Sequence, residues 1–202
     1  MNYKFTIIGV IVIVGVMFGL VYLGTKSNQG GQITLPSDID TSQGIKFLEY
    51  GDFQCPACAA YNPILMTLKE EYAGRIEFAY KHFPLKQHKN AEPSAYAAEA
   101  ARNQGKFWEM DILLFSGQNE WANSEKPLEI FKKYAQSLDL NIDTFVADYN
   151  SSEIKKKVSS EYAEGVGLGV NSTPTFFING KKINNPGSYE EFKSIFEQLI
   201  QK

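Results

Sequence analysis

Cysteine, histidine and surplus positive charge are all scarce in this sequence. Its 202 residues include two cysteines and two histidines, and 20 Lys and Arg stand against 23 Asp and Glu for a net charge of −3. Two cysteines are too few for a disulfide-rich miniprotein or for a four-cysteine zinc or iron–sulfur site. Without a basic surplus, nucleic acid is not expected as the main partner. Internal repeats of about 20–50 residues are also missing, which excludes solenoids and propellers.

The first part of the chain carries one long apolar run. Residues 5–24 contain no charged residue and are rich in Ile, Val and Gly, and twenty helical residues span roughly 30 Å, the thickness of a bilayer core. We therefore predict a transmembrane signal-anchor at 5–24 behind a cytoplasmic stub at 1–4, with the rest of the chain outside the cytoplasm. A cleaved signal peptide is the alternative. Its apolar stretch is usually shorter, about 7–15 residues, and it ends in a small-x-small site that residues 23–26 match poorly.

A linker and one folded domain follow the apolar run. Residues 25–43 are rich in Gly, Ser, Gln and Asp and show no hydrophobic periodicity, which predicts a flexible linker. Hydrophobic residues make up 44% of the chain and charged residues 21%, so a substantial core can be buried. We expect that core in a single domain at 44–202.

The hydrophobic pattern of 44–202 predicts an α/β fold of order β-α-β, then an all-helical insertion at about 84–168, then β-β-α. Apolar segments without helical period predict strands at 45–53, 76–83, 174–178 and 181–183. Asn179-Gly180, between the last two, predicts a type I′ hairpin. Ser188 and Glu191 predict a capping box that opens the last helix. Amphipathic segments predict further helices directly after residue 55 and at 93–104, 107–115, 127–138, 142–149 and 152–165.

The motif that carries chemistry is Cys55-Pro56-Ala57-Cys58, at the predicted junction of the first strand and the first helix. Sulfurs three positions apart on a first helical turn come within bonding distance. The free N–H groups and the dipole at a helix start stabilise a thiolate on Cys55, and the thiolate is the species that attacks disulfides. Pro56 suits the first helical position because its missing N–H costs nothing there. Cys58, one turn further in, is then the resolving thiol.

Two other interpretations of the cysteine pair are weaker. A passive disulfide across so short a loop removes little chain entropy from the unfolded state. A zinc site with His82 and His88 needs a gap of 23 residues after Cys58, which exceeds the usual linker of about 12–15 residues. We therefore expect redox chemistry, with no metal and no bound cofactor.

Four features of the chain occur together in one known family. They are FLEYGDFQCPAC, Pro63 eight residues after Cys55, HFPL followed by an alanine-rich stretch and GKFWEM, and GVNSTPTFFING at 169–180. With them the chain from Ile45 onward resembles the DsbA-like thioredoxin-fold disulfide oxidoreductases, in the membrane-anchored form found outside the cytoplasm of bacteria. The resemblance implies a cis Pro174 that faces the cysteines and a loop, including Thr173, that binds an extended substrate. A trans proline at the start of a strand is the alternative.

One acidic residue, Glu49, interrupts the first predicted strand six positions before Cys55. The resemblance implies a buried acid near the active site, and a buried carboxylate could relay a proton to or from Cys58. Lys81, inside the second predicted strand, is the expected partner of Glu49. The alternative is an exposed pair at the edge of the sheet.

Three functions fit these motifs. By the resemblance, the first is an oxidase that passes its Cys55–Cys58 disulfide to unfolded secreted or surface proteins and is reoxidised by a quinone-linked membrane partner of the DsbB or VKOR type. The second is a disulfide reductase or isomerase, which stays open because the Pro56-Ala57 dipeptide lacks the histidine of the strongest oxidases. The third is a non-catalytic chaperone or metal-binding module with the same fold.

Overall fold

The computed structural model describes residues 35–36 and 39–201. The expected cytoplasmic stub, the expected transmembrane anchor and most of the expected linker lie outside these described residues. None of the described helices is long and apolar enough to cross a membrane.

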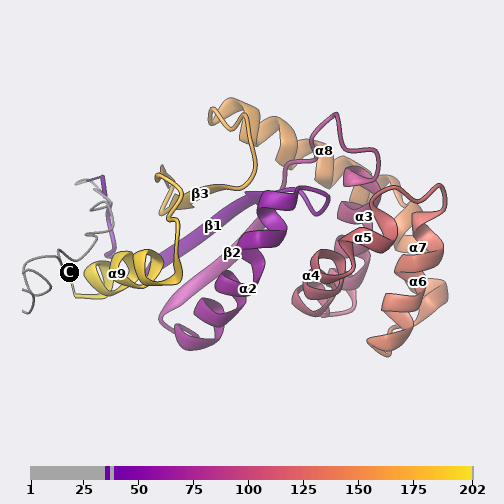
Figure 1. The fold of residues 1–202 in the computed structure, drawn as a ribbon, viewed down its shortest axis with the longest axis horizontal. Helices are drawn as coiled ribbons and strands as arrows, with labels where there is room; N and C mark the ends of the chain where they lie inside the picture. Colours follow the sequence, from indigo (N-terminus) through magenta and orange to yellow (C-terminus); the bar gives the residue numbers. More distant parts are fainter. Residues whose placement is uncertain (1–34, 37–38, 202) are drawn as a thin grey trace, which may run out of the picture. The chain divides into compact units, whose positions relative to one another are not determined.

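A four-stranded sheet forms the centre of the fold (Figure 1), with the strand order β2-β1-β3-β4. β1 (Ile45–Gly51) pairs in parallel with β2 (Ile76–His82) and antiparallel with β3 (Thr175–Ile178). β4 (Lys181–Lys182) pairs antiparallel with β3. β1 is thus an inner strand, in agreement with its nearly continuous apolar sequence.

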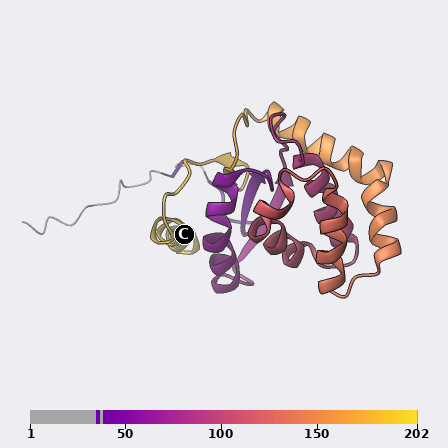
Figure 2. The same ribbon diagram turned by 45° about the vertical axis from the view of Figure 1, so that its right-hand side comes forward.

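The two faces of the sheet are covered by different helices. α2 (Pro56–Glu71) and α9 (Tyr189–Ile200) lie on the same face of the sheet (Figures 1 and 2). Phe47 contacts two aromatic rings of α9, with centroid distances of 5.8 and 5.4 Å. The opposite face meets α8 (Ser152–Gly167), because Lys81 of β2 pairs with Glu164 of that helix. Residues of β1 therefore point alternately toward α2 and toward α8.

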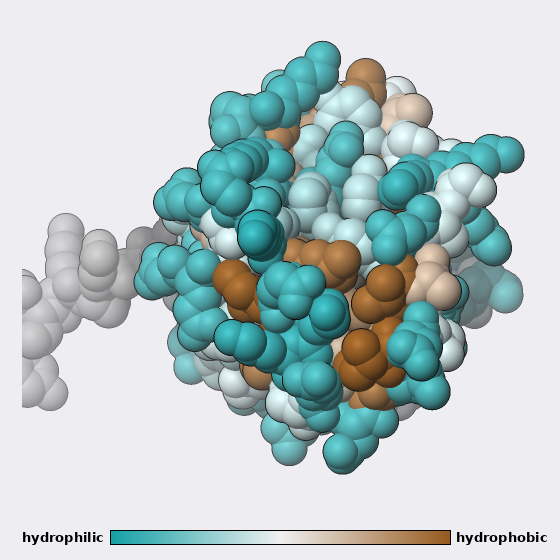
Figure 3. Space-filling view, turned by 90° about the vertical axis from the view of Figure 1, so that its right-hand side faces the viewer, coloured by the Kyte–Doolittle hydropathy of each residue, from teal (hydrophilic) through white to brown (hydrophobic). Residues whose placement is uncertain are grey.

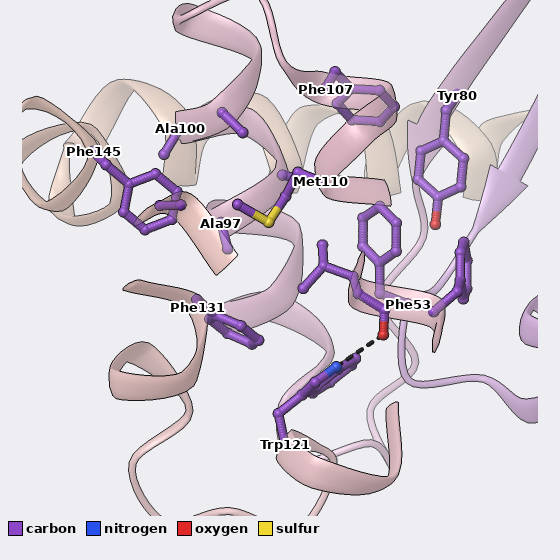
Figure 4. Close-up of a cluster of buried hydrophobic side chains, with 14 of the residues drawn as sticks. Phe53, Tyr80, Ala97, Ala100, Phe107, Met110, Trp121, Phe131 and Phe145 are labelled. Atoms are coloured by element: carbon purple, nitrogen blue, oxygen red, sulfur yellow. Dashed lines mark hydrogen bonds between the residues drawn. The ribbon is translucent and has the colours of Figure 1, made fainter. Parts of the chain in front are cut away.

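The insertion between β2 and β3 is entirely helical in the described chain. Its core is built on the alanine-rich face of α3 (Ala91–Asn103), where Ala97 and Ala100 are fully buried. The aromatic rings of Trp121, Phe131 and Phe145 surround that face, and the Trp121 indole N–H donates to the Leu114 carbonyl at 2.9 Å (Figure 4). Seen from the insertion side, the surface is mostly hydrophilic with small apolar groups between (Figure 3). Within the insertion, the described helices that precede α8 are α3 (Ala91–Asn103), α4 (Phe107–Ser116), α5 (Gln118–Trp121), α6 (Pro127–Ser137) and α7 (Ile142–Asn150).

The element order agrees with the sequence prediction, and the differences are local. β1 ends at Gly51 rather than at residue 53, and the short helix α5 was not predicted. The hairpin is confirmed, because Asn179 and Gly180 have the positive φ angles of 47° and 80° that a type I′ turn needs. The predicted capping box is wrong in one of its two bonds. Ser188 Oγ accepts from the Glu191 N–H as expected, but the Glu191 carboxylate accepts from the N–H of Gly187 instead of that of Ser188.

The packed part of the chain begins before Gly44, the residue where we expected the domain to start. Ile39 is buried. The Asn179 side-chain amide donates to the carbonyl oxygens of Asp40 and Gly44, at 2.5 and 2.8 Å, and its oxygen accepts from the Lys46 N–H at 2.6 Å. One hairpin residue therefore fixes the entry of the chain into the sheet.

Candidate active site

Cys55 occupies the N-cap of α2, at the end of a four-residue loop after β1. Its backbone is extended, with φ −74° and ψ 121°, and Pro56 takes the first helical position. The Cys55 N–H donates to the Asp52 carbonyl at 3.0 Å, which closes the loop into a turn. The sulfur of Cys55 therefore stands where the N–H groups of the first helical turn have no helical partner.

The environment of Cys55 favours its thiolate. The hydrogen bond from the Cys58 thiol is the largest cause that lowers the pKa of Cys55, from its ordinary 9.0 to about 5, and the N–H groups of Cys58 and Ala57 add to it against the effect of burial. The Thr173 side chain also lowers this pKa. Its hydroxyl is buried without a hydrogen-bond partner and is thus available to donate to a thiolate. The thiolate is therefore the form of Cys55 that this environment favours at neutral pH.

Cys58 has the opposite character. It is fully buried, and burial raises its pKa well above the ordinary 9.0, with further increases from the hydrogen bond to Cys55 and from the charge of Glu49. Both cysteines are free thiols in this structure. The pair therefore consists of a thiolate at Cys55, which keeps 7% of its surface exposed, and a protonated, fully buried thiol at Cys58.

The loop before β3 closes the site from the other side. The Thr173–Pro174 peptide bond is cis, and the Thr173 carbonyl lies 3.5 Å from the sulfur of Cys55. The Pro174 carbonyl accepts a hydrogen bond from the Asn185 side chain at 2.8 Å. The expected cis proline is present, and the loop that carries it contacts Cys55.

Glu49 lies beneath the cysteines and is buried, with 6% of its surface exposed. Burial raises its pKa well above 4.5, the charges of Asp111 and Cys55 raise it further, and a hydrogen bond with Cys58 opposes these effects. The expected partner is wrong, because Lys81 Nζ contacts both carboxylate oxygens of Glu164 at 2.6 Å. The reason is the strand register, in which Glu49 is paired with Tyr80, so Lys81 points to the opposite face of the sheet.

Backbone and side-chain groups of the segment that follows β2 hold the active-site loop. The buried Asp52 carboxylate accepts from the Gln54 and Leu85 N–H groups at 2.8 and 3.0 Å and hydrogen bonds to His88 Nδ1 at 2.6 Å. Gln54 accepts from the N–H of Asn90 at 2.6 Å. The loop that presents Cys55 is therefore positioned by residues more than thirty positions away in the chain.

The two histidines that a zinc site would need have carboxylate partners. His88 contacts Asp52, and His82 is buried with its Nε2 2.8 Å from Glu99. Within the described residues, no group of three or more His, Cys, Asp and Glu is arranged to hold a metal ion.

Comparison with known proteins places this site in a family. A family profile described as thioredoxin matches residues 44–198. The chain belongs to the thioredoxin family. Among solved structures, Wolbachia pipientis alpha-DsbA1 is 21% identical, with a TM-score of 0.69 over 84% of this chain and 94% of that one. Bacillus subtilis BdbD is 20% identical, with a TM-score of 0.68 over 85% and 93%. The predicted thioredoxin fold with a DsbA-like helical insertion is confirmed.

Curated relatives share the thioredoxin-family domain within longer chains. The Na(+)/H(+) antiporter NhaA 1 of Mycolicibacterium gilvum is 33% identical over 147 residues, which cover 70% of this chain and 23% of that protein. NhaA 3 of Salinispora tropica is 33% identical over 147 residues, which cover 72% and 22%. The chain thus spans about a quarter of the length of the curated relatives it matches.

The structure brings together Cys55, Cys58, Glu49 and the Thr173–Pro174 loop, as the thioredoxin-family motifs implied. The catalytic and substrate-binding roles given to these residues, and to Pro56 and Ala57 between the cysteines, stay predictions. Three further polar residues, which were not predicted from the sequence, support the site and are buried: Asp52, Asn62 and Asp111. Asp111 did leave a signal, since it is a lone charge in the apolar stretch MDILLF.

Proposed function

We propose that the chain is a thiol–disulfide oxidoreductase that acts as a dithiol oxidase. The observation that carries the proposal is the contrast between the two cysteines, with the pKa of Cys55 lowered to about 5 and that of Cys58 raised well above 9.0. A low pKa at the outer sulfur makes it a good leaving group as well as an available nucleophile. The buried sulfur is protected from the solvent and reacts with its neighbour.

The reaction follows from this contrast in two exchanges. A thiolate of the client attacks Cys55 Sγ of the oxidised protein, the Cys55–Cys58 bond breaks, and Cys58 leaves with the electron pair and takes up a proton. A second client thiolate attacks the client sulfur of the mixed disulfide, and Cys55 leaves as a thiolate. The client dithiol loses two electrons and becomes a disulfide, and the protein disulfide gains them. Glu49, hydrogen bonded to Cys58, supplies the proton that Cys58 takes up.

The direction of electron flow follows from what each redox form can stabilise. Only the reduced form carries a thiolate on Cys55, so every contact that lowers the pKa of Cys55 stabilises the reduced form over the oxidised one. A disulfide whose reduced form is stabilised is a stronger oxidant. The hydrogen bonds from Cys58 and from the helix start therefore support oxidation of clients, without a histidine in the dipeptide.

The partners and the location belong to the same proposal. Residues 5–24 anchor the chain in the cell membrane, and the catalytic domain lies on the extracytoplasmic side. The clients are unfolded secreted or surface proteins with free thiols, which bind in extended form along the Thr173–Pro174 loop. A quinone-linked membrane protein of the DsbB or VKOR type restores the disulfide, and the protein needs no bound cofactor.

The test is the reduction potential of the Cys55–Cys58 couple, together with activity on a reduced, unfolded client. In glutathione buffers we expect a potential well above the value of about −270 mV for thioredoxin, toward the range of about −180 to −120 mV. We also expect the oxidised protein to form disulfides in the client, with Cys58→Ser as the inactive control. A potential near that of thioredoxin would favour the reductase. Failure of the two cysteines to form a disulfide would favour the non-catalytic module.

A further inference from the structure

The proposed oxidase leaves Glu49 without a direct route for protons to and from solvent, and the inference that follows rests on that proposed function. During reoxidation, Cys58 must lose its proton to attack the mixed disulfide at Cys55, and Glu49 is the base that contacts it. Glu49 is 6% exposed, and its Oε1 is buried without a hydrogen-bond partner among the described residues. Glu49 gives a proton to Cys58 in the client step and takes one back in reoxidation, so any exchange of protons between Glu49 and water has to pass through neighbouring groups.

A second buried carboxyl contacts the active-site helix one turn beyond Cys58. Cys58 and Asn62 are four residues apart on α2, so their Cβ atoms are about 5–6 Å apart on one helix face. Glu49, from β1, hydrogen bonds to Cys58, while Asp111, from α4, accepts a hydrogen bond from Asn62 at 2.6 Å. The sheet and the insertion thus each place one carboxyl against the same face of the active-site helix.

The two carboxyls also interact electrostatically. The charge of Asp111 is, after burial, the largest cause that raises the pKa of Glu49. Burial raises the pKa of Asp111 to about 7, against the hydrogen bond from Asn62. The other charged or titratable groups that act on this pair are Cys55 at the N-cap of α2, Cys58 and Lys69 of α2, Tyr80 of β2 with its unpartnered hydroxyl, and Arg102 of α3.

An opening to solvent lies next to Asp111. Asn62 and Pro63 of α2 and Ile112 of α4 line a groove of about 280 Å³ on the surface. Asp111 itself is 1% exposed, whereas its chain neighbour Ile112 is 45% exposed. Asn62, which holds Asp111, is therefore part of the wall between the buried carboxyl and the groove.

We propose that Asp111 is the outer carboxyl of a two-carboxyl relay, which carries protons between Glu49 and water at the groove beside Asn62. In reoxidation the proton passes from Cys58 Sγ to the Glu49 carboxylate and then to the Asp111 carboxylate. It returns along the same path when Cys58 is reprotonated, and only bonds to hydrogen change. Asp111 touches neither sulfur. It acts through Glu49 and is a positioning residue for proton transfer.

The test isolates the step in which Cys58 acts. When the reduced full chain is mixed with oxidised glutathione, attack by Cys55 depends on the glutathione concentration, whereas resolution by Cys58 does not. General acid–base catalysis contributes about 10²–10⁴-fold to a rate. We therefore expect the resolution step at pH 7 to slow about 100-fold in Glu49→Gln, which removes the base itself, and about tenfold in Asp111→Asn, which acts through Glu49. The rate–pH profile of Asp111→Asn should lose the inflection near pH 7, while the Cys55 step stays unchanged.

Two further variants make the result specific. Asp143→Asn, at an exposed position of α7, makes the same change of charge outside the site and should keep the rate and the profile of the natural chain. Asn62→Ala removes the hydrogen bond that lowers the pKa of Asp111, so the inflection should move to higher pH. This variant keeps the carboxyl and serves as the deciding measurement if Asp111→Asn does not fold.

Three results would overturn the relay. The first is a rate–pH profile of Asp111→Asn that matches that of Asp143→Asn. The second is a slower rate of Asp111→Asn with an unchanged profile, which indicates a structural role only, and the third is an inflection that does not move in Asn62→Ala. Failure of the proposed function looks different. In that case the natural chain itself shows no concentration-independent release of glutathione.

Discussion

The reduced and oxidised forms of the protein should exchange their order of stability as the pH rises from 5 to 8. The pKa of Cys55 is about 5 in the folded reduced form and 9.0 ordinarily. An acid with a lowered folded pKa stabilises the fold as the pH rises above that pKa, fully above the unfolded pKa, and loses this effect as the pH falls through the folded pKa. The oxidised form has no thiolate and gains nothing from this ionisation.

The magnitude follows from the two pKa values. The thiolate stabilises the reduced fold by about 0.4 kcal/mol at pH 5 and about 2.7 kcal/mol at pH 7. In the oxidised form, a disulfide that closes a four-residue loop restricts the unfolded chain and contributes about 2 kcal/mol. The oxidised form should therefore be more stable by about 1.5 kcal/mol at pH 5 and the reduced form by about 1 kcal/mol at pH 7, with equality at about pH 6–6.5.

The assay is urea unfolding followed by tryptophan fluorescence, with and without reductant, at several pH values up to 8. This range avoids the ionisation of Cys58 in the unfolded chain, which would act in the opposite direction because its folded pKa is raised. Cys55→Ser is the control, since it carries no thiolate at this position and should not gain stability with pH relative to the oxidised form. A difference that stays constant with pH, or an oxidised form that is more stable at pH 7 and above, would refute the reasoning and favour a reductase.

Three further predictions concern other parts of the chain. Cys58→Ser should accumulate mixed disulfides with clients on non-reducing gels and Cys55→Ser should not, and equal trapping would refute their assigned roles. Glu99→Gln should lower the free energy of unfolding by about 3 kcal/mol at pH 7, because His82, Arg102 and Lys157 outweigh the effect of burial and lower the pKa of Glu99 to about 2. The natural chain should lose that stability as the pH falls from 4.5 toward 2, whereas the variant should not. A chain that begins at Gly44 should fold and be redox-active, but with stability lower by about 1.5–3 kcal/mol than one that keeps the buried Ile39.

The fold could be predicted because its signals are local and repeated along the chain. The strand that ends at the cysteine pair, the alanine-rich helix and the Asn179-Gly180 turn each follow from short-range preferences of the backbone. The end of β1 could not be placed in this way. Residues 52–54 are held by hydrogen bonds to His88, Asn90 and other distant residues, and a hydrophobic pattern does not record such bonds.

The partner of Glu49 shows a second limit of the sequence. Glu49 and Lys81 both lie inside predicted strands, but whether they share a face depends on the register, and a shift of one residue reverses every side chain. The observed register pairs Glu49 with Tyr80 and directs Lys81 to the α8 side. Asp111 shows the same limit for a helix. Its isolation in an apolar stretch marks it as unusual, but the sequence does not show which neighbouring helix it faces.

The hydrogen bonds of Asn179 have a mechanical consequence. They hold Asp40 and Gly44 at the hairpin end of β1, whereas Cys55 follows the other end of that strand. Seven residues at about 3.3 Å each separate these two ends by roughly 23 Å. A force applied through the chain before Ile39 would therefore be borne by the hairpin end of the sheet. The reactive sulfur, a full strand length away, would keep its geometry under such a load.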